Sequence, residues 1–165
     1  MVSRYPVRYA FVCLLSLVVA IAVSAQESVN VSEGRSWGIG MQVGVPYGGL
    51  ISVRSWFSPT FGAEGIVFLS GSSYFMEGTL TARGLFRASD TDVVDFYIAA
   101  GATLPLEART LTLSVLGGIE FGFRLAPALA WNIEFGASYA LDGNFTMAVG
   151  TGLHYYFPVR QRAQQ

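Results

Sequence analysis

Apolar and polar residues alternate along most of the chain after residue 36, with the period of two that is typical of β-strands. The alternation is clearest from Phe145 to Phe157, where bulky apolar residues at odd positions oppose mostly small residues at even positions. The pattern predicts eight strands bounded by turn residues, at 37–45, 50–57, 61–70, 74–87, 95–104, 110–123, 130–141 and 145–157. We therefore expect an all-β fold, in which eight antiparallel strands in up-and-down order close into a barrel.

Charged residues lie on only one face of these strands. When each strand is read so that its bulky apolar residues share a face, that face carries no charged residue. An arginine facing lipid at the bilayer midplane costs roughly 2–4 kcal/mol, so we expect the charge-free face to contact lipid in a transmembrane barrel. The opposite face has small residues and balanced charge, which suit a narrow interior. There we predict an ion-pair network of Arg54, Glu64, Glu77, Arg83, Arg87, Glu120, Arg124 and Glu134, with Asp95 as a further acidic residue.

Aromatic residues gather at one end of the predicted strands. If the barrel begins in the periplasm, every strand has an aromatic residue at its periplasmic end on the apolar face: Trp37, Phe57, Phe61, Phe86, Phe96, Phe123, Trp131 and Phe157. The other end is less regular, with Tyr74, Tyr139 and Phe145 on that face and Tyr47 in a turn. Membrane proteins concentrate such residues at the interfaces, so we interpret the complete set as an aromatic girdle. A general preference of aromatic residues for strands would instead scatter them along the strands.

The N-terminus predicts export. Arg4 and Arg8 precede an apolar run from Ala10 to Val23, and small residues follow before a cut at Gln26, which is the pattern of a secretory signal peptide. An uncleaved helical anchor is the weaker interpretation because the run is short. The predicted organisation is a removed signal, a polar periplasmic segment, an outer-membrane barrel and a polar periplasmic tail, at residues 1–25, 26–35, 36–157 and 158–165.

Composition narrows the class of protein. Charged residues make up 13% of the chain, about half of the roughly 25% found in soluble globular domains. The single cysteine, Cys13, lies in the predicted signal, so the mature chain has no thiol for a disulfide or a metal site. Without Arg4 and Arg8, ten basic residues become eight against eleven acidic ones, which excludes nucleic acid as a partner.

These features together resemble a small eight-stranded outer-membrane barrel of the OmpA/OmpX type, over residues 36–157. The closing segment MAVGTGLHYYF is similar to the aromatic-ended final strand by which such proteins are recognised for assembly. Family members usually finish on that aromatic residue, whereas here Phe157 is followed by a polar tail that Pro158 separates from the sheet. The resemblance implies a monomer in the outer membrane of a Gram-negative bacterium, with membrane lipid and the barrel assembly machinery as its partners.

The expected function follows from the size of the barrel. Eight strands enclose a space that side chains fill, which excludes a large diffusion pore, and the four connections opposite the girdle are too short for adhesion. We expect a non-enzymatic protein with a structural or narrow-permeability role in the envelope, porin-like only in fold. One alternative is a soluble exported barrel that carries an apolar ligand, as a lipocalin does. A less favoured alternative is an enzyme that modifies outer-membrane lipid.

Candidate chemistry is sparse. His154 is the only histidine, and lipid A deacylases of this fold have a serine two residues beyond their histidine, where this chain has Tyr156. The motif therefore does not carry over, and we interpret His154 as a residue that lines the interior. Asp90 and Asp92 form an acidic turn that we interpret as solvated rather than as a cation site. The sequence predicts no catalytic residue, no metal and no cofactor.

Overall fold

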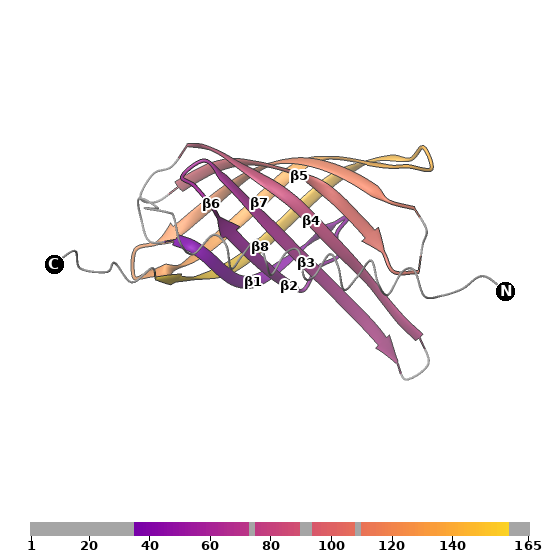
Figure 1. Ribbon diagram of the computed structural model, residues 1–165, viewed down its shortest axis with the longest axis horizontal. Helices are drawn as coiled ribbons and strands as arrows, with labels where there is room; N and C mark the ends of the chain where they lie inside the picture. Colours follow the sequence, from indigo (N-terminus) through magenta and orange to yellow (C-terminus); the bar gives the residue numbers. More distant parts are fainter. Residues whose placement is uncertain (1–34, 73–74, 90–93, 108–109, 159–165) are drawn as a thin grey trace.

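The computed structural model describes residues 35–72, 75–89, 94–107 and 110–158. Eight antiparallel strands pair in sequence order and form one closed barrel (Figure 1). The strands are β1 (Arg35–Val45), β2 (Ile51–Trp56), β3 (Phe61–Ser72), β4 (Phe75–Ser89), β5 (Val94–Pro105), β6 (Thr112–Phe123), β7 (Ala126–Ala140) and β8 (Phe145–Pro158). The predicted all-β, eight-stranded, up-and-down barrel is confirmed. Among the described residues, no helix has the length and hydropathy that crossing a membrane requires.

Several sequence-based predictions lie outside the described residues. They are the signal of residues 1–25, the polar segment up to residue 34, the acidic turn with Asp90 and Asp92, and the polar tail from residue 159. The side chain of Glu77 is also outside the described part, although its backbone belongs to β4.

Strand β7 begins earlier than the alternation predicts. The sequence pattern predicts a connection over residues 124–129, but the strand already starts at Ala126. The register between β6 and β7 shifts after Gly122, because Gly122 pairs with Ala130 and Phe123 pairs with Ala126. Leu129, inside this bulge, pairs instead with Tyr155 on β8. A bulge interrupts the period of two and bends the strand, so the start of β7 leaves no alternating signature in the sequence.

The two faces of the sheet differ sharply in polarity. Arg54 and Glu134 have no exposed surface and lie inside the barrel. Phe135, the residue after Glu134, points outward and is 64% exposed. Met147 on the neighbouring strand β8 also points outward and is 74% exposed. The alternation of a β-strand places successive side chains on opposite faces, so the polar pattern of the sequence becomes a polar interior and an apolar outer wall.

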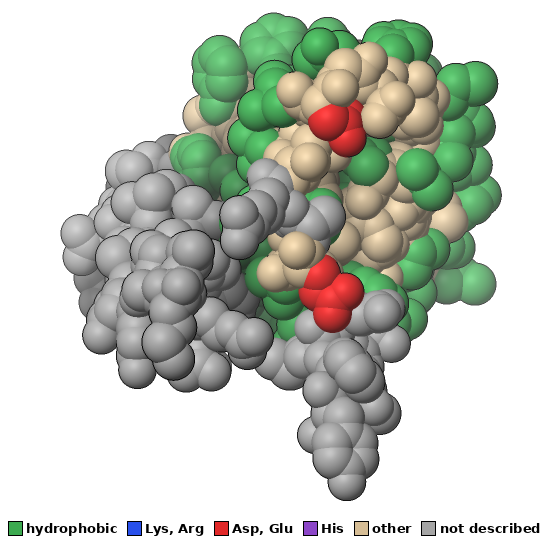
Figure 2. Space-filling view, turned by 90° about the vertical axis from the view of Figure 1, so that its right-hand side faces the viewer, with side chains coloured by type: hydrophobic (Ala, Val, Ile, Leu, Met, Phe, Trp, Pro, Cys, Tyr) green, Lys and Arg blue, Asp and Glu red, His purple; other side chains and the backbone are tan. Residues whose placement is uncertain are grey.

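The barrel has two distinct ends. The terminal end is the one where β1 starts and β8 finishes, and the hairpin end carries the β1–β2, β3–β4, β5–β6 and β7–β8 connections. At the hairpin end, β7 and β8 are joined by a tight turn in which the amide of Ala140 donates to the carbonyl of Asn144 over 2.8 Å. Figure 2 shows this end, where acidic side chains lie within a rim of hydrophobic ones; Glu107 and Asp142 are exposed in its loops.

Candidate functional site

Five of the eight residues predicted for the interior network come together at the middle of the barrel. Each comes from a different strand, and all are at least 96% buried: Arg54 on β2, Glu64 on β3, Arg83 on β4, Glu120 on β6 and Glu134 on β7. We call these five residues the charged cluster. Its formation needs each residue to occupy an inward position at a similar height in the barrel, which is narrow enough for inward side chains to meet across it.

Arg54 binds one glutamate from the neighbouring strand β3 and one from β6 across the barrel. Its Nη1 atom donates to Oε2 of Glu120 over 2.5 Å, and its Nη2 atom donates to Oε2 of Glu64 over 2.9 Å. The same Nη2 lies 3.7 Å from Oε1 of Glu134. The guanidinium also lies 5.0 Å from the ring centre of Tyr97, within the range of a cation–π contact.

Arg83 binds Glu134 and also the Glu64 carboxylate that Arg54 contacts. Its Nη1 and Nη2 atoms donate to Oε2 and Oε1 of Glu134 over 2.7 and 2.8 Å, which is a bidentate pair. Its Nε and Nη2 atoms donate to Oε2 of Glu64 over 2.9 and 2.6 Å. Two arginines thus share three glutamates, and every carboxylate of the charged cluster contacts at least one guanidinium.

Phenol groups supply further donors to the glutamates. Tyr97 donates to Oε1 of Glu134 over 2.5 Å, and Tyr47 donates to Oε2 of the same residue over 2.8 Å. Tyr156 lies 3.0 and 3.1 Å from the two carboxylate oxygens of Glu120. Buried charges are tolerated when such hydrogen bonds replace the water that folding removes.

His154 lies beside the charged cluster with a serine and a glutamate. Its Nε2 atom is 2.9 Å from Oγ of Ser52 and 3.2 Å from Oε1 of Glu64, while its Nδ1 atom is 3.4 Å from Nδ2 of Asn132. In a catalytic triad, the acid binds the ring nitrogen opposite to the one that faces the serine. Here serine and glutamate face the same nitrogen, and Ser52 donates to Glu64 over 2.5 Å. This arrangement does not activate the hydroxyl as a nucleophile.

A second pair of charges lies nearer the terminal end. Arg87 is buried on β4, with its Nη2 atom 3.8 Å from Oδ2 of Asp95 and its guanidinium 4.0 Å from the ring centre of Trp56. Arg87 and Asp95 therefore face the interior as predicted, at a level of the barrel nearer the terminal end than the charged cluster. Trp56 in turn meets Tyr97 edge to face, with ring centres 6.4 Å apart.

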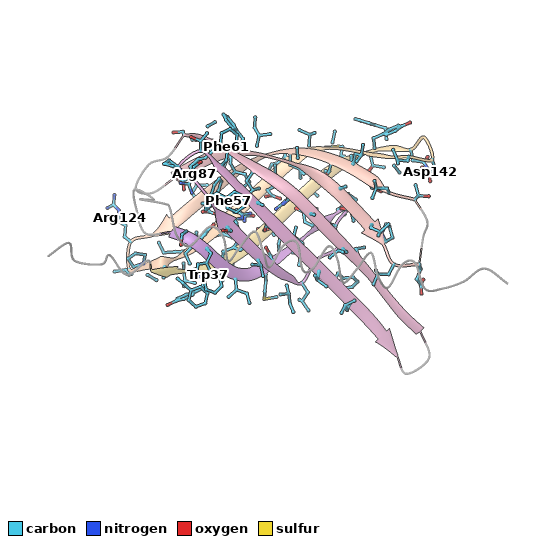
Figure 3. The ribbon with its side chains drawn as sticks, viewed as in Figure 1. Trp37, Phe57, Phe61, Arg87, Arg124 and Asp142 are labelled. Atoms are coloured by element: carbon cyan, nitrogen blue, oxygen red, sulfur yellow. The ribbon has the colours of Figure 1, made fainter. Side chains whose placement is uncertain are left out.

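Arg124 is a correction to the predicted network. It is exposed in the turn after β6 and points away from the barrel at the terminal end (Figure 3). If the alternation continued past Phe123, Arg124 would point inward. However, β6 ends at Phe123, and Arg124 lies in the turn that follows, outside the sheet.

The eight residues predicted as an aromatic girdle all lie towards the terminal end and are exposed or half-exposed on the outer wall. Trp37, Phe57 and Phe61 lie in the same half of the barrel in Figure 3, far from Asp142. Two neighbouring pairs are in ring contact: Trp37 stacks on Phe157 with centres 4.1 Å apart, and Phe61 meets Phe86 edge to face at 5.4 Å.

Sequence reasoning missed Tyr47 and Gln42. Tyr47 was predicted only as an aromatic residue in a turn at the less regular end of the strands, yet its side chain is fully buried and reaches Glu134. Gln42 donates from Nε2 to Oε2 of Glu134 over 3.0 Å and accepts from Nδ2 of Asn132 over 3.0 Å. Gln42 does have a detectable signal, because it is the one polar side chain among the inward positions from Gly38 to Gly44, which are otherwise glycine. The inward bend of the Tyr47 turn has no such signal.

Known proteins give no further guide to the site. Comparison with protein-family models, with characterised proteins and with solved structures finds no match. In the described part of the chain, no three His, Cys, Asp or Glu side chains are arranged to hold a metal ion.

Proposed function

We propose that this chain is an integral β-barrel protein of the bacterial outer membrane, non-enzymatic, with a structural or narrow-permeability role in a Gram-negative envelope. The observation that carries the proposal is the inverted polarity of the barrel. Five charged side chains lie buried at its centre, while Phe135 and Met147 are among the many large apolar residues exposed on its wall.

The apolar wall supports a lipid environment. A soluble barrel that carries an apolar ligand needs apolar residues inside and polar residues outside, which is the reverse arrangement. Even Thr151, a polar residue on the wall, has its hydroxyl occupied: it accepts from Nε1 of Trp131 and donates to the carbonyl of Asn132, both over 2.8 Å. Such pairing suits hydrocarbon, where an unsatisfied polar group costs several kcal/mol.

The interior supports a closed or narrow barrel rather than a pore. Trp56, Tyr97 and Tyr156 are almost completely buried between the charged cluster and the terminal end. With the charged cluster at the middle, these rings leave the interior occupied by side chains, as expected for eight strands. We infer that membrane lipid and, during biogenesis, the assembly machinery are the partners of a monomeric barrel.

The first experiment is gel mobility of the mature protein extracted from envelopes in detergent, loaded with and without boiling. A closed membrane barrel stays folded in cold detergent, so a heat-dependent shift together with recovery in the outer-membrane fraction supports the proposal. Recovery as a soluble periplasmic protein without detergent would overturn it and favour the ligand-carrying barrel. A lipid-modifying activity abolished by His154→Ala would instead favour an enzyme.

A further inference from the structure

The β1–β2 turn sends a side chain back into the barrel. Tyr47 leaves the sheet at the hairpin end, yet no part of it is exposed. The turn is held by two hydrogen bonds, from the amide of Gly44 to the carbonyl of Gly48 over 2.8 Å and from Oγ1 of Thr79 to the carbonyl of Tyr47 over 2.6 Å. Gly49 follows with a φ of +86°, a backbone conformation that favours glycine.

The space that the Tyr47 ring occupies is formed by glycines. A Cβ atom added to Gly150 on β8 would lie 1.5 Å from the phenol oxygen, so this position admits no methyl group while the ring is in place. A Cβ atom added to Gly44 on β1 would lie 2.7 Å from the ring and 2.3 Å from the backbone carbonyl oxygen of Val149, so Gly44 is required by the neighbouring strand as well as by the ring. The two glycines therefore shape a socket that matches a phenol, and we call this space the phenol socket.

The phenol socket also matches a phenol chemically. At its inner end, Oε2 of Glu134 accepts from the Tyr47 hydroxyl over 2.8 Å, and Nε2 of Gln42 lies 3.4 Å from the phenol oxygen of Tyr47. The guanidinium of Arg83 lies 5.0 Å from the ring centre. An anionic acceptor for the hydroxyl and a cation near the ring are what a site for a free phenol would provide.

We propose that Tyr47 fills a phenol-binding site of its own barrel, which lies between the β1–β2 turn and the charged cluster. Removal of the ring opens the phenol socket to small phenols from solution. This inference uses only contacts inside the barrel, so it stands or falls separately from the location of the protein in a membrane.

The test uses the full chain with Tyr47→Ala, folded in detergent, with p-cresol as the probe and thermal unfolding as the readout. We expect the Tyr47→Ala variant to unfold at a lower midpoint temperature than the unmodified protein. Addition of p-cresol should raise the midpoint of the variant but not that of the unmodified protein. Toluene has the same shape without the hydroxyl, so its apparent dissociation constant should be about tenfold higher or more, because the hydrogen bond to a charged group is lost. No stabilisation by p-cresol, or equal stabilisation by toluene, would overturn the proposal.

Two further samples serve as a control for specificity and as a safeguard against failure of the variant to fold. Tyr139→Ala removes the same atoms from an exposed tyrosine on the outer wall, and p-cresol should not raise its midpoint. If Tyr47→Ala does not fold alone, it is refolded with p-cresol present; recovery of the folded band supports the phenol socket, and failure to recover contradicts it.

Discussion

At the scale of single residues, Glu134 is the side chain on which most of the interior contacts converge. Its carboxylate accepts hydrogen bonds from Gln42, Tyr47, Arg83 and Tyr97, which come from three strands and one turn. A carboxylate removed from water at this depth is stable only because these donors replace its hydration. Its loss would leave several donors, one of them a guanidinium, without their acceptor.

We therefore expect Glu134→Ala to lower the free energy of unfolding by about 3–5 kcal/mol, the usual result of removing one partner from a buried ion pair. Urea-induced unfolding of the detergent-folded barrel measures this change. Glu107→Ala is the control, because Glu107 is exposed in a loop and its removal should change stability by less than about 0.5 kcal/mol. Equal effects of the two substitutions would contradict the structural role of the charged cluster.

Residue positions inside the barrel are predictable where the strand pattern is regular. Arg54, Glu64 and Arg83 face inward as the alternation predicts, since charge and period of two agree at these positions. The individual ion pairs were not predictable, because they depend on which residues of non-adjacent strands lie at the same height in the barrel. Arg54 and Glu120, for example, come from β2 and β6.

At the scale of elements, the strands tolerate large side chains inside only where neighbouring strands supply small ones. Gly118 on β6 lies against the ring of Tyr97, since a Cβ atom there would be 2.3 Å from the ring, and Gly150 lies against Tyr47 in the same way. The glycines on inward faces thus define where the aromatic rings fit. By contrast, Gly84 lies on the outer wall, where a Cβ atom would have its nearest neighbour at 3.9 Å.

This contrast gives a matched pair of substitutions. Gly150→Ala should lower the free energy of unfolding by about 1–3 kcal/mol because it overpacks the phenol socket. Gly84→Ala makes the same change in open space and should leave stability almost unchanged. In the double variant with Tyr47→Ala, the cost of Gly150→Ala should largely disappear, since the two residues share one space. Additive costs in chemical unfolding would show that Gly150 and Tyr47 do not compete.

Element boundaries were predictable to within a few residues except at β7. Its early start depends on pairing with β8 across a bulge, and a single strand carries no signal of its neighbour's register. The tight β7–β8 turn was predictable, because an Asp-Gly-Asn segment between two strands favours a hairpin turn. In the structure Gly143 adopts a φ of +102°, a conformation that glycine allows.

At the scale of the whole molecule, the apolar wall and the polar interior together determine which solvent the barrel suits. In water, the exposed apolar residues of β1, β7 and β8 would form a continuous hydrophobic surface of the kind that causes association. In a bilayer, the same surface is matched to hydrocarbon. The outer wall, rather than the interior, is therefore the place to test the surrounding solvent.

Phe135→Arg places a charge on the outer wall next to Glu134, at the level of the charged cluster. In phospholipid vesicles we expect a loss of roughly 2–4 kcal/mol in the free energy of unfolding, as for arginine at a bilayer midplane. Asp142→Arg, in the exposed hairpin turn, introduces the same side chain outside the hydrocarbon and should cost no more than about 1 kcal/mol, for the two exposed hydrogen bonds that Asp142 accepts from Asn144. If both variants are equally stable, the outer wall at this level is in contact with water.

The pairing of β1 with β8 also decides when the barrel can close. Trp37 pairs with Phe157 and Val45 pairs with Val149, so the first strand of the barrel finds its second neighbour only in the last. Contacts between such distant parts of a chain form slowly. While β8 is not in place, one side of β1 presents unpaired amides and carbonyls, which are a template for another chain. A partly assembled barrel therefore exposes this edge until β8 pairs with β1, and closure removes it in a single step.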